Sequence, residues 1–98
     1  MGCEMIIGAC TIELHLPGNG SLKGKRSVLK SMTSRLRREF NVSVAEVDLH
    51  DVWQTAVIGV VCVSNRQDYT HALLAQVTQW IERYRADVQL VDYEIEML

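Results

Sequence analysis

The sequence lacks the features that mark several large classes of protein. Its three cysteines include no C-x-x-C pair, which argues against a disulfide framework or a zinc site and is typical of a reducing cytoplasm. It has no apolar run of the roughly 18 residues that a membrane-spanning helix needs, and no basic region precedes its N-terminal apolar residues. Met1-Gly2-Cys3 resembles an acylation signal, but Ile6 stands where a myristoylation motif has Ser or Thr. We therefore expect a cytoplasmic protein without a lipid anchor.

Catalytic and nucleotide-binding motifs are also missing. Residues 18–26, GNGSLKGKR, approach a Walker A loop, which would need Gly at Asn19 and Ser or Thr at Arg26. A dinucleotide fingerprint would need its third Gly at Lys23. No nucleophile has a base at a recognisable spacing. We therefore expect a protein that is not an enzyme and binds no cofactor, and an enzyme acting on a small phosphorylated compound is only the third alternative.

The candidates for a metal site or an acid–base site are Asp48, His50 and Asp51. These residues fall in a segment with the composition of a hairpin turn, where Asp is favoured without any metal. Three ligands of this kind do not make a recognisable metal motif. We expect an ordinary turn and no metal site.

Positive charge is concentrated in one segment of the chain. Residues 21–40, SLKGKRSVLKSMTSRLRREF, contain seven of the ten basic residues and one acid, Glu39, whereas the rest of the chain has three bases and eleven acids. The basic residues of this segment are Lys23, Lys25, Arg26, Lys30, Arg35, Arg37 and Arg38. The net charge of −2 therefore hides a strongly divided distribution.

The same segment has the pattern of an amphipathic helix. Its apolar arc contains Leu22, Leu29, Met32, Leu36 and Phe40. One flank of that arc carries Lys23, Arg26, Lys30 and Arg37. Such a stripe of cations is either a solvated helix face or a surface that binds anions.

The position of the first cations favours anion binding. Lys23, Lys25 and Arg26 would lie at the positive end of the helix dipole, where each costs about 0.3–1 kcal/mol if exposed and unpaired. A bound anion would offset this cost, because backbone N–H groups, dipole and side chains would all face the same negative charge. The predicted phosphate-binding residues are Ser21, Lys23, Lys25, Arg26, Lys30 and Arg37.

Alternation of apolar and polar residues predicts four strands, at 4–16, 42–49, 53–63 and 88–98. A second helix follows Ser64, which forms a capping-box pattern with Gln67, and its core-facing stripe includes Trp80 and Tyr84. The order β-α-β-β-α-β predicts one ferredoxin-like α+β domain over residues 1–98, a four-stranded antiparallel sheet with two helices on one face.

Details of the strands predict the two faces of the sheet. Alternation in the first strand places Cys10 on the buried face, as an inert thiol. A parity switch after Val44 predicts a β-bulge or an irregular edge strand for the second strand. The third strand is apolar on both faces, so its second face needs a cover. Glu13 and the acids of the fourth strand would share the open face.

RNA-recognition modules with this fold stack bases on aromatic residues of the central strands. Here the first strand has no aromatic residue and the third has none after Trp53. We therefore expect no base recognition by the sheet, and any RNA would meet the cations of the first helix through its phosphates.

Three blocks of the sequence resemble the YlxP-like family of small bacterial proteins. The blocks are IELHLPGNGSLKGKR, then RLRREFNVSVAEVD with the following HDVWQ, and VVCVSN. The resemblance implies a ferredoxin-like fold, a cytoplasmic bacterial protein and a gene often found near translation-initiation and ribosome-maturation genes, with no established activity. Where Gly24 stands, the family more usually has an acidic residue, and this departure makes the local site more positive.

Two functions remain after these exclusions. The first is an accessory factor that binds ribosomal or other structured RNA through the basic helix, which a Lys25→Glu/Arg26→Glu variant is expected to abolish with the fold intact. The second is a structural or regulatory module whose apolar sheet face pairs with a second copy, as a homodimer, or with a partner protein.

Overall fold

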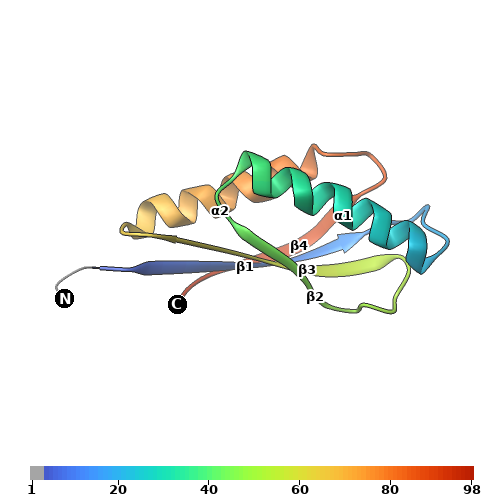
Figure 1. The fold of residues 1–98 in the computed structure, drawn as a ribbon, viewed down its shortest axis with the longest axis horizontal. Helices are drawn as coiled ribbons and strands as arrows, with labels where there is room; N and C mark the ends of the chain where they lie inside the picture. The colour runs from blue at the N-terminus through green and yellow to red at the C-terminus, as the bar shows by residue number, and fades with distance from the viewer. Residues whose placement is uncertain (1–3) are drawn as a thin grey trace.

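The computed structural model describes residues 4–98 and confirms the predicted order of elements (Figure 1). The elements are β1 (Ile6–His15), α1 (Leu22–Glu39), β2 (Ser43–Asp48), β3 (Thr55–Ser64), α2 (Gln67–Glu82) and β4 (Gln89–Met97). The sheet has the order β2-β3-β1-β4 with antiparallel neighbours, and both helices cover the same face. This is the ferredoxin-like α+β arrangement. The prediction about acylation concerns Gly2 and Cys3, which lie outside the described residues.

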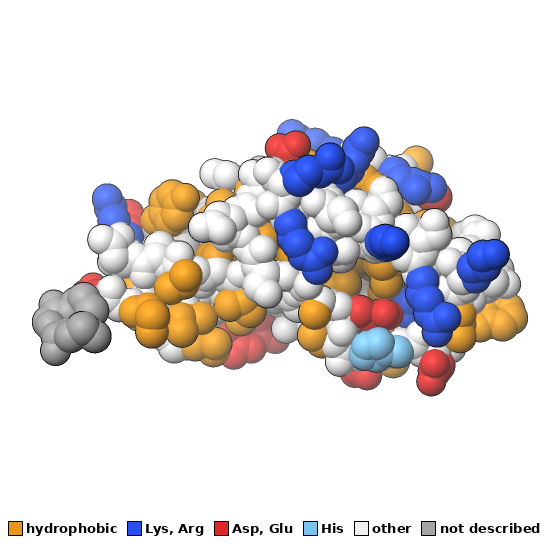
Figure 2. Space-filling model, in the orientation of Figure 1, with side chains coloured by type: hydrophobic (Ala, Val, Ile, Leu, Met, Phe, Trp, Pro, Cys, Tyr) orange, Lys and Arg blue, Asp and Glu red, His pale blue; other side chains and the backbone are white. Residues whose placement is uncertain are grey.

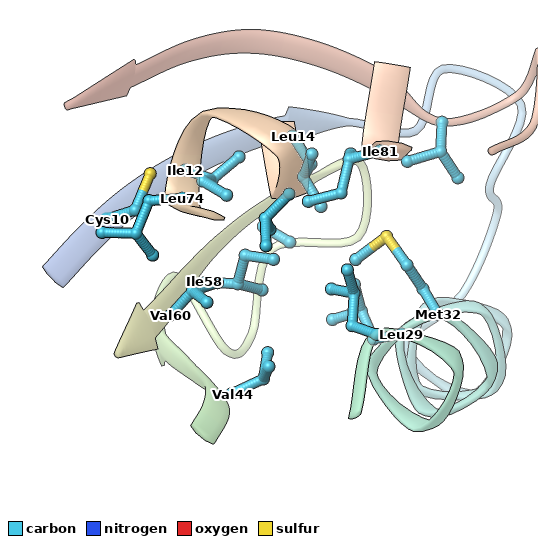
Figure 3. Close-up of a cluster of buried hydrophobic side chains, with 14 of the residues drawn as sticks. Cys10, Ile12, Leu14, Leu29, Met32, Val44, Ile58, Val60, Leu74 and Ile81 are labelled. Carbon is cyan, nitrogen blue, oxygen red and sulfur yellow. The ribbon is translucent and has the colours of Figure 1, made fainter. Parts of the chain in front are cut away.

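The core lies between the helices and the sheet (Figure 3). Alternate residues of the central strands point toward the helices, and Ile12, Leu14, Ile58 and Val60 are fully buried. The helices add Leu29, Met32, Leu36, Leu74, Val77 and Ile81. Each such side chain contributes about 1.5–3 kcal/mol of hydrophobic free energy, so the apolar arc of α1 and the stripe of α2 hold both helices on the sheet.

Helix α1 begins and ends close to the predicted positions. Ser21 is its N-cap, and the Ser21 hydroxyl accepts a hydrogen bond from the Gly24 N–H at 2.9 Å. Phe40 has extended backbone angles and ends the helix. The first turn contains no acidic residue, which leaves the positive end of the dipole without a compensating side chain.

The capping box predicted at the start of α2 is wrong. The N-cap is Arg66, whose side chain makes no capping hydrogen bond. The Ser64 hydroxyl instead accepts from the Arg66 N–H at 3.0 Å and lies 2.6 Å from the Thr70 hydroxyl. Asp68 supplies negative charge to the first turn, and the Arg66 guanidinium at 2.7 Å lowers the pKa of this exposed carboxyl.

Helix α2 approaches the sheet closely at Gly8 in β1. A β-carbon at this position would collide with the Thr70 methyl group and the Leu74 side chain of α2. Only glycine allows α2 to pack at this distance.

The strands confirm the expected irregularity. The pairing of β2 with β3 shifts register between Glu46 and Asp48, two residues beyond the parity switch seen in the sequence. A second shift, between Glu13 and Leu14 in the pairing of β1 with β4, was not predicted.

The two described cysteines are free and buried. Burial raises the pKa of the Cys10 thiol to about 11 and also raises the pKa of Cys62. The prediction that Cys10 lies on the buried face is confirmed, while Cys3 lies outside the described residues. Across residues 4–98, neither helix is long and apolar enough to cross a membrane.

Candidate functional site

Helix α1 carries an exposed stripe of cations, visible on the helix-bearing side of the molecule in Figure 2. Lys23, Arg26, Lys30 and Arg37 follow one another at intervals of one or two helical turns, and all four are exposed. We call these four residues the cationic stripe. Within residues 4–98, none of the four forms an ion pair with an acidic side chain, so their charge is available to an external anion.

Lys25 does not belong to this surface, which corrects its assignment as a phosphate ligand. Its side chain is 1% exposed and its ammonium lies 2.9 Å from a carboxylate oxygen of Glu46, which is 21% exposed. The ammonium also donates to the carbonyl oxygens of Leu49, at 2.6 Å, and Val52, at 2.8 Å. The ammonium therefore makes two hydrogen bonds to carbonyl groups and an ion pair with Glu46, whose buried oxygen has no hydrogen-bond partner in the described chain. Lys25→Glu would place two carboxylates together, so we no longer expect this variant to fold normally.

The inward-facing lysine joins the start of α1 to the loop between β2 and β3. Leu49 of this loop adopts a left-handed conformation with φ of 56°. Both its backbone N–H and its carbonyl group are hydrogen-bonded. Its N–H donates to the Asp48 carboxylate at 2.8 Å, while its carbonyl accepts from Lys25. A further bond, from the Asn19 amide to the Trp53 carbonyl at 2.6 Å, fixes the loop before α1 to the same segment. The N-terminal end of α1 is therefore held in place by its neighbours.

Two other predicted phosphate ligands have additional roles. Ser21 caps α1 and stays exposed. Arg37 is exposed, and one of its guanidinium nitrogens donates to the Val44 carbonyl of β2 at 2.7 Å. A guanidinium has five N–H donors, so Arg37 keeps donors for a ligand.

The hairpin residues Asp48, His50 and Asp51 are exposed. Asp48 bonds to the Leu49 N–H, and His50 Nε2 lies 3.2 Å from the Glu46 carbonyl. Within residues 4–98, no group of three or more His, Cys, Asp or Glu side chains is arranged to hold a metal ion.

A groove of about 390 Å³ lies between the C-terminal halves of the two helices. Its lining residues are Arg35, Phe40, Gln76, Gln79, Trp80, Arg83 and Tyr84. An adjoining hollow shares Arg35 and Trp80 and adds Arg38 and Glu39. We call the two together the interhelix groove. A volume above about 300 Å³ is in the range of small-ligand sites.

Two stacked aromatic rings lie in the interhelix groove. The centroids of Trp80 and Tyr84 are 5.0 Å apart with an angle of 24° between the ring planes. The Tyr84 hydroxyl lies 3.0 Å from the Ser31 hydroxyl of α1, and the Arg35 guanidinium carbon is 6.0 Å from the Tyr84 ring centre. The prediction that Trp80 and Tyr84 face the core is therefore only partly confirmed, because both remain half-buried.

The sheet face opposite the helices is divided into an acidic half and an apolar half. Strand pairing places Glu13 opposite Asp92 and Thr11 opposite Glu94, which confirms that Glu13 and the acids of β4 share this face. The apolar half is formed by Val47 of β2 and by Val61 and Val63 of β3, of which Val61 is 39% and Val63 58% exposed. We call these three residues the valine patch. No element within residues 4–98 covers it.

Sequence reasoning identified the cationic stripe but missed the interhelix groove. Helical spacing assigned Trp80 and Tyr84 to packing, and cations such as Arg35 and Arg38 are favourable at a helix C-terminus without any ligand. The sequence did contain one usable signal. Three arginines, Arg35, Arg37 and Arg38, crowd the last turns of α1 with a single acid beside them.

Comparisons with known proteins agree with the predicted resemblance. The family model described as "Protein of unknown function (DUF503)" matches residues 7–95. A relative described as "Uncharacterized protein YlxP", from Bacillus subtilis strain 168, is 35% identical over 79 residues, which cover 81% of this chain and 86% of the relative. Among solved structures, the de novo designed protein Foldit4 has a TM-score of 0.55 at 14% identity, covering 97% of both chains. This last likeness shows the fold alone.

Proposed function

Because this chain belongs to the DUF503 family, whose description assigns no function, we propose from its surface chemistry that it binds the phosphates of structured RNA through α1. The family resemblance implies a gene near translation-initiation and ribosome-maturation genes. This association favours ribosomal RNA, which would make the protein a ribosome-associated accessory factor. The observation that carries the proposal is the cationic stripe, in which Lys23, Arg26, Lys30 and Arg37 are exposed without acidic partners in the described chain.

The stability cost of the stripe supports a binding role. Lys23 and Arg26 lie in the first turns of α1, where no acid balances the helix dipole. Arg26 and Lys30 are like charges four residues apart, which costs a few tenths of a kcal/mol more. Phosphate at this end would be stabilised by the cations and by the dipole together. Arg37 extends the same line toward the other end of the helix.

Binding of this kind depends steeply on salt. Neutralising about four phosphates gives a log–log slope of roughly −3 to −4 for affinity against salt concentration. Binding of this kind has little preference for RNA sequence, because contacts to phosphates carry no information about the bases.

The test is RNA binding by wild type and by the charge-reversal variant Lys23→Glu/Arg26→Glu, measured at two salt concentrations. The variant should bind weakly, with a slope smaller by about two, because each substitution removes one cation that would neutralise a phosphate. The matched control is Arg66→Glu/Arg85→Glu, which changes the net charge equally but removes only two exposed ion pairs outside the cationic stripe. Equal weakening by both variants would mean that net charge alone governs binding, and the proposal would fail.

A second candidate function is homodimerisation through the valine patch. Val61 and Val63 are exposed on the central strand β3 beside the edge strand β2, with no cover in residues 4–98. A second copy, related by a two-fold axis parallel to the strands over β2 and β3, would place valine on valine. The same axis would leave the acids of β1 and β4 at opposite outer edges, where they do not meet. A dimer of this geometry would present two copies of the cationic stripe on its outer faces.

Sedimentation velocity over a range of protein concentrations tests this second candidate. Val63→Lys should shift the protein to monomer, whereas Val91→Lys should not. Val91 is the matched control because it is a strand valine with nearly the same exposure, 56% against 58%, but lies outside the valine patch. A wild-type protein that stays monomeric throughout the range would exclude this dimer.

A further inference from the structure

The interhelix groove combines aromatic rings, cations and amides in one place, which is the chemistry that recognises a nucleotide. We propose that it accepts an unpaired base of single-stranded RNA, stacked against Trp80, with the neighbouring phosphates on Arg35 and Arg38. The inference deepens the RNA-binding function proposed above and rests on it, because the cationic stripe attracts the RNA at the flank of α1 toward β2 and the groove takes one of its nucleotides at the flank toward α2. It assigns the part of the RNA that the protein recognises, namely an unstacked nucleotide beside a phosphate-bound segment.

The aromatic floor of the groove is already in position to stack. Trp80 packs against Tyr84 with ring centroids 5.0 Å apart, and Tyr84 is held from the other helix by its hydroxyl contact with Ser31 at 3.0 Å. Both rings remain half-buried, so part of each faces the groove. A ring that is fixed before binding gives up little side-chain entropy when a base stacks on it. Base–aromatic stacking is also tolerant of sequence, because every base has a flat face.

Cations surround these rings. Arg35 and Arg38 are three residues apart and therefore share one side of α1, while Arg83 lines the groove from the end of α2. All three are exposed, and none forms an ion pair within residues 4–98. The guanidinium of arginine binds phosphate with two parallel hydrogen bonds. The groove thus offers phosphate contacts next to the stacking surface.

The remaining lining residues suit a base edge. Gln76 and Gln79 are exposed amides on α2 at the groove. Each amide has a donor and an acceptor, which a base can meet on its Watson–Crick edge once it is unpaired. A single carboxylate, Glu39, stands at the edge of the groove beside Arg35 and Arg38. Its negative charge repels an anion, so removing that charge should raise the affinity of the groove for phosphate.

The experiment compares three probes on the full-length protein: a short oligouridylate, an RNA duplex with the same number of phosphates, and inorganic polyphosphate. Tryptophan fluorescence is measured in the Trp53→Leu variant, which leaves Trp80 as the only tryptophan. The groove predicts that oligouridylate quenches Trp80 and binds more tightly than the duplex, whose bases are paired and stacked. Polyphosphate should bind through the cations without quenching by a stacked base.

Trp80→Leu removes the stacking surface, and Trp53→Leu is its matched control at an exposed tryptophan outside the groove. Trp80→Leu should weaken oligouridylate binding by about 5- to 150-fold, the range that base–aromatic stacking covers, and leave duplex binding unchanged. Far-UV circular dichroism checks the fold. If Trp80→Leu does not fold, Arg35→Gln, a change at an exposed residue, should lower the preference for oligouridylate over duplex. Glu39→Gln should raise affinity for all three probes.

The possible results separate this inference from the function it rests on. Equal, salt-sensitive binding of all three probes without quenching of Trp80 would overturn the groove and leave the cationic stripe standing. Quenching of Trp80 by oligouridylate, together with binding of all three probes that Lys23→Glu/Arg26→Glu leaves unchanged, would support the groove and refute phosphate binding by the stripe. Tight oligouridylate binding that Trp53→Leu destroys and Trp80→Leu preserves would move the base contact to the hairpin and overturn the proposal.

Discussion

At the N-terminal end of α1, Lys25 turns inward to Glu46 and to two carbonyl groups of the β2–β3 loop, whereas at the C-terminal end Arg35 and Arg38 remain at the surface beside Trp80. Both ends are basic, but a dense set of hydrogen bonds fixes the first and an open groove adjoins the second. The comparison teaches that a charge cluster read from sequence can contain a structural member and binding members side by side.

The largest expected effect on stability comes from removing the Lys25 contacts at the N-terminal end of α1. Lys25→Met keeps most of the side-chain volume but leaves the Glu46 carboxylate without its partner. Removing one member of a buried pair costs about 3–5 kcal/mol, and because Glu46 is 21% exposed we expect the lower end of this range. Urea unfolding measures the cost.

Two variants sharpen that result. Lys23→Met, the same substitution at an exposed lysine two residues away, should change stability by less than about 0.5 kcal/mol. Lys25→Met/Glu46→Leu should be more stable than Lys25→Met alone, because no unpaired charge remains. Similar stabilities for Lys25→Met and Lys23→Met would show that the inward contacts contribute nothing.

The opposite end is tested by Arg37→Glu. This change removes the hydrogen bond to the Val44 carbonyl, worth about 0.5–1.5 kcal/mol, and places a negative charge at the negative end of the helix dipole, for about 0.3–1 kcal/mol more. We expect a total destabilisation of about 1–2 kcal/mol in urea unfolding. Arg38→Glu should destabilise the protein less, because it changes the interaction with the helix dipole without removing this hydrogen bond. The reverse order would contradict the role given to Arg37.

A smaller effect is expected at the cap of α1. Ser21→Ala removes the acceptor for the Gly24 N–H and should cost about 1 kcal/mol, whereas Ser21→Gly should cost only a few tenths. The pair also separates capping from phosphate binding. RNA affinity that falls in Ser21→Gly, with stability nearly unchanged, would support Ser21 as a phosphate ligand, and unchanged affinity would leave it as a cap alone.

The smallest effect has the opposite sign. Lys23→Glu places a negative charge at the positive end of the α1 dipole, which should stabilise the protein by about 0.5 kcal/mol while weakening RNA binding. Thermal unfolding should show a rise of about 2–4 °C at this chain length. Lys23→Gln should fall between the two proteins in both measurements. A gain in stability without any decrease in affinity would remove Lys23 from the binding surface.

Much of the fold was readable from the sequence because its signals are local. Leu29, Met32 and Leu36 recur at helical spacing, and all three are buried on the inner side of α1. Alternation in β1 placed Cys10 and Ile12 on the covered face for the same reason. The start of α2 was not readable, since Ser64 bonds to Arg66 and Thr70 instead of capping the helix, and several hydroxyl partners compete within a few residues.

The sequence predicted the candidate site only where a single helix, α1, carries its residues. Helical spacing aligned Lys23, Arg26 and Lys30 on a single face, which the structure leaves exposed. Trp80 and Arg35 come from different helices, so no spacing within either helix reveals that they line the same groove. The exposure of Trp80 depends on how far apart the two helices pack on the sheet, which no short stretch of sequence determines.

The sequence by itself determined the order of the elements, the faces of the helices and the concentration of positive charge, because each depends on periodicity or composition along a short stretch. Only the tertiary structure decided which cations are structural and which are free to bind. The carbonyl groups that hold Lys25 belong to Leu49 and Val52, 24 and 27 residues away in the chain. Folding places them around the ammonium. Helical spacing puts Lys25 in line with the buried Leu29 and Met32, but no local pattern shows which groups would hold it.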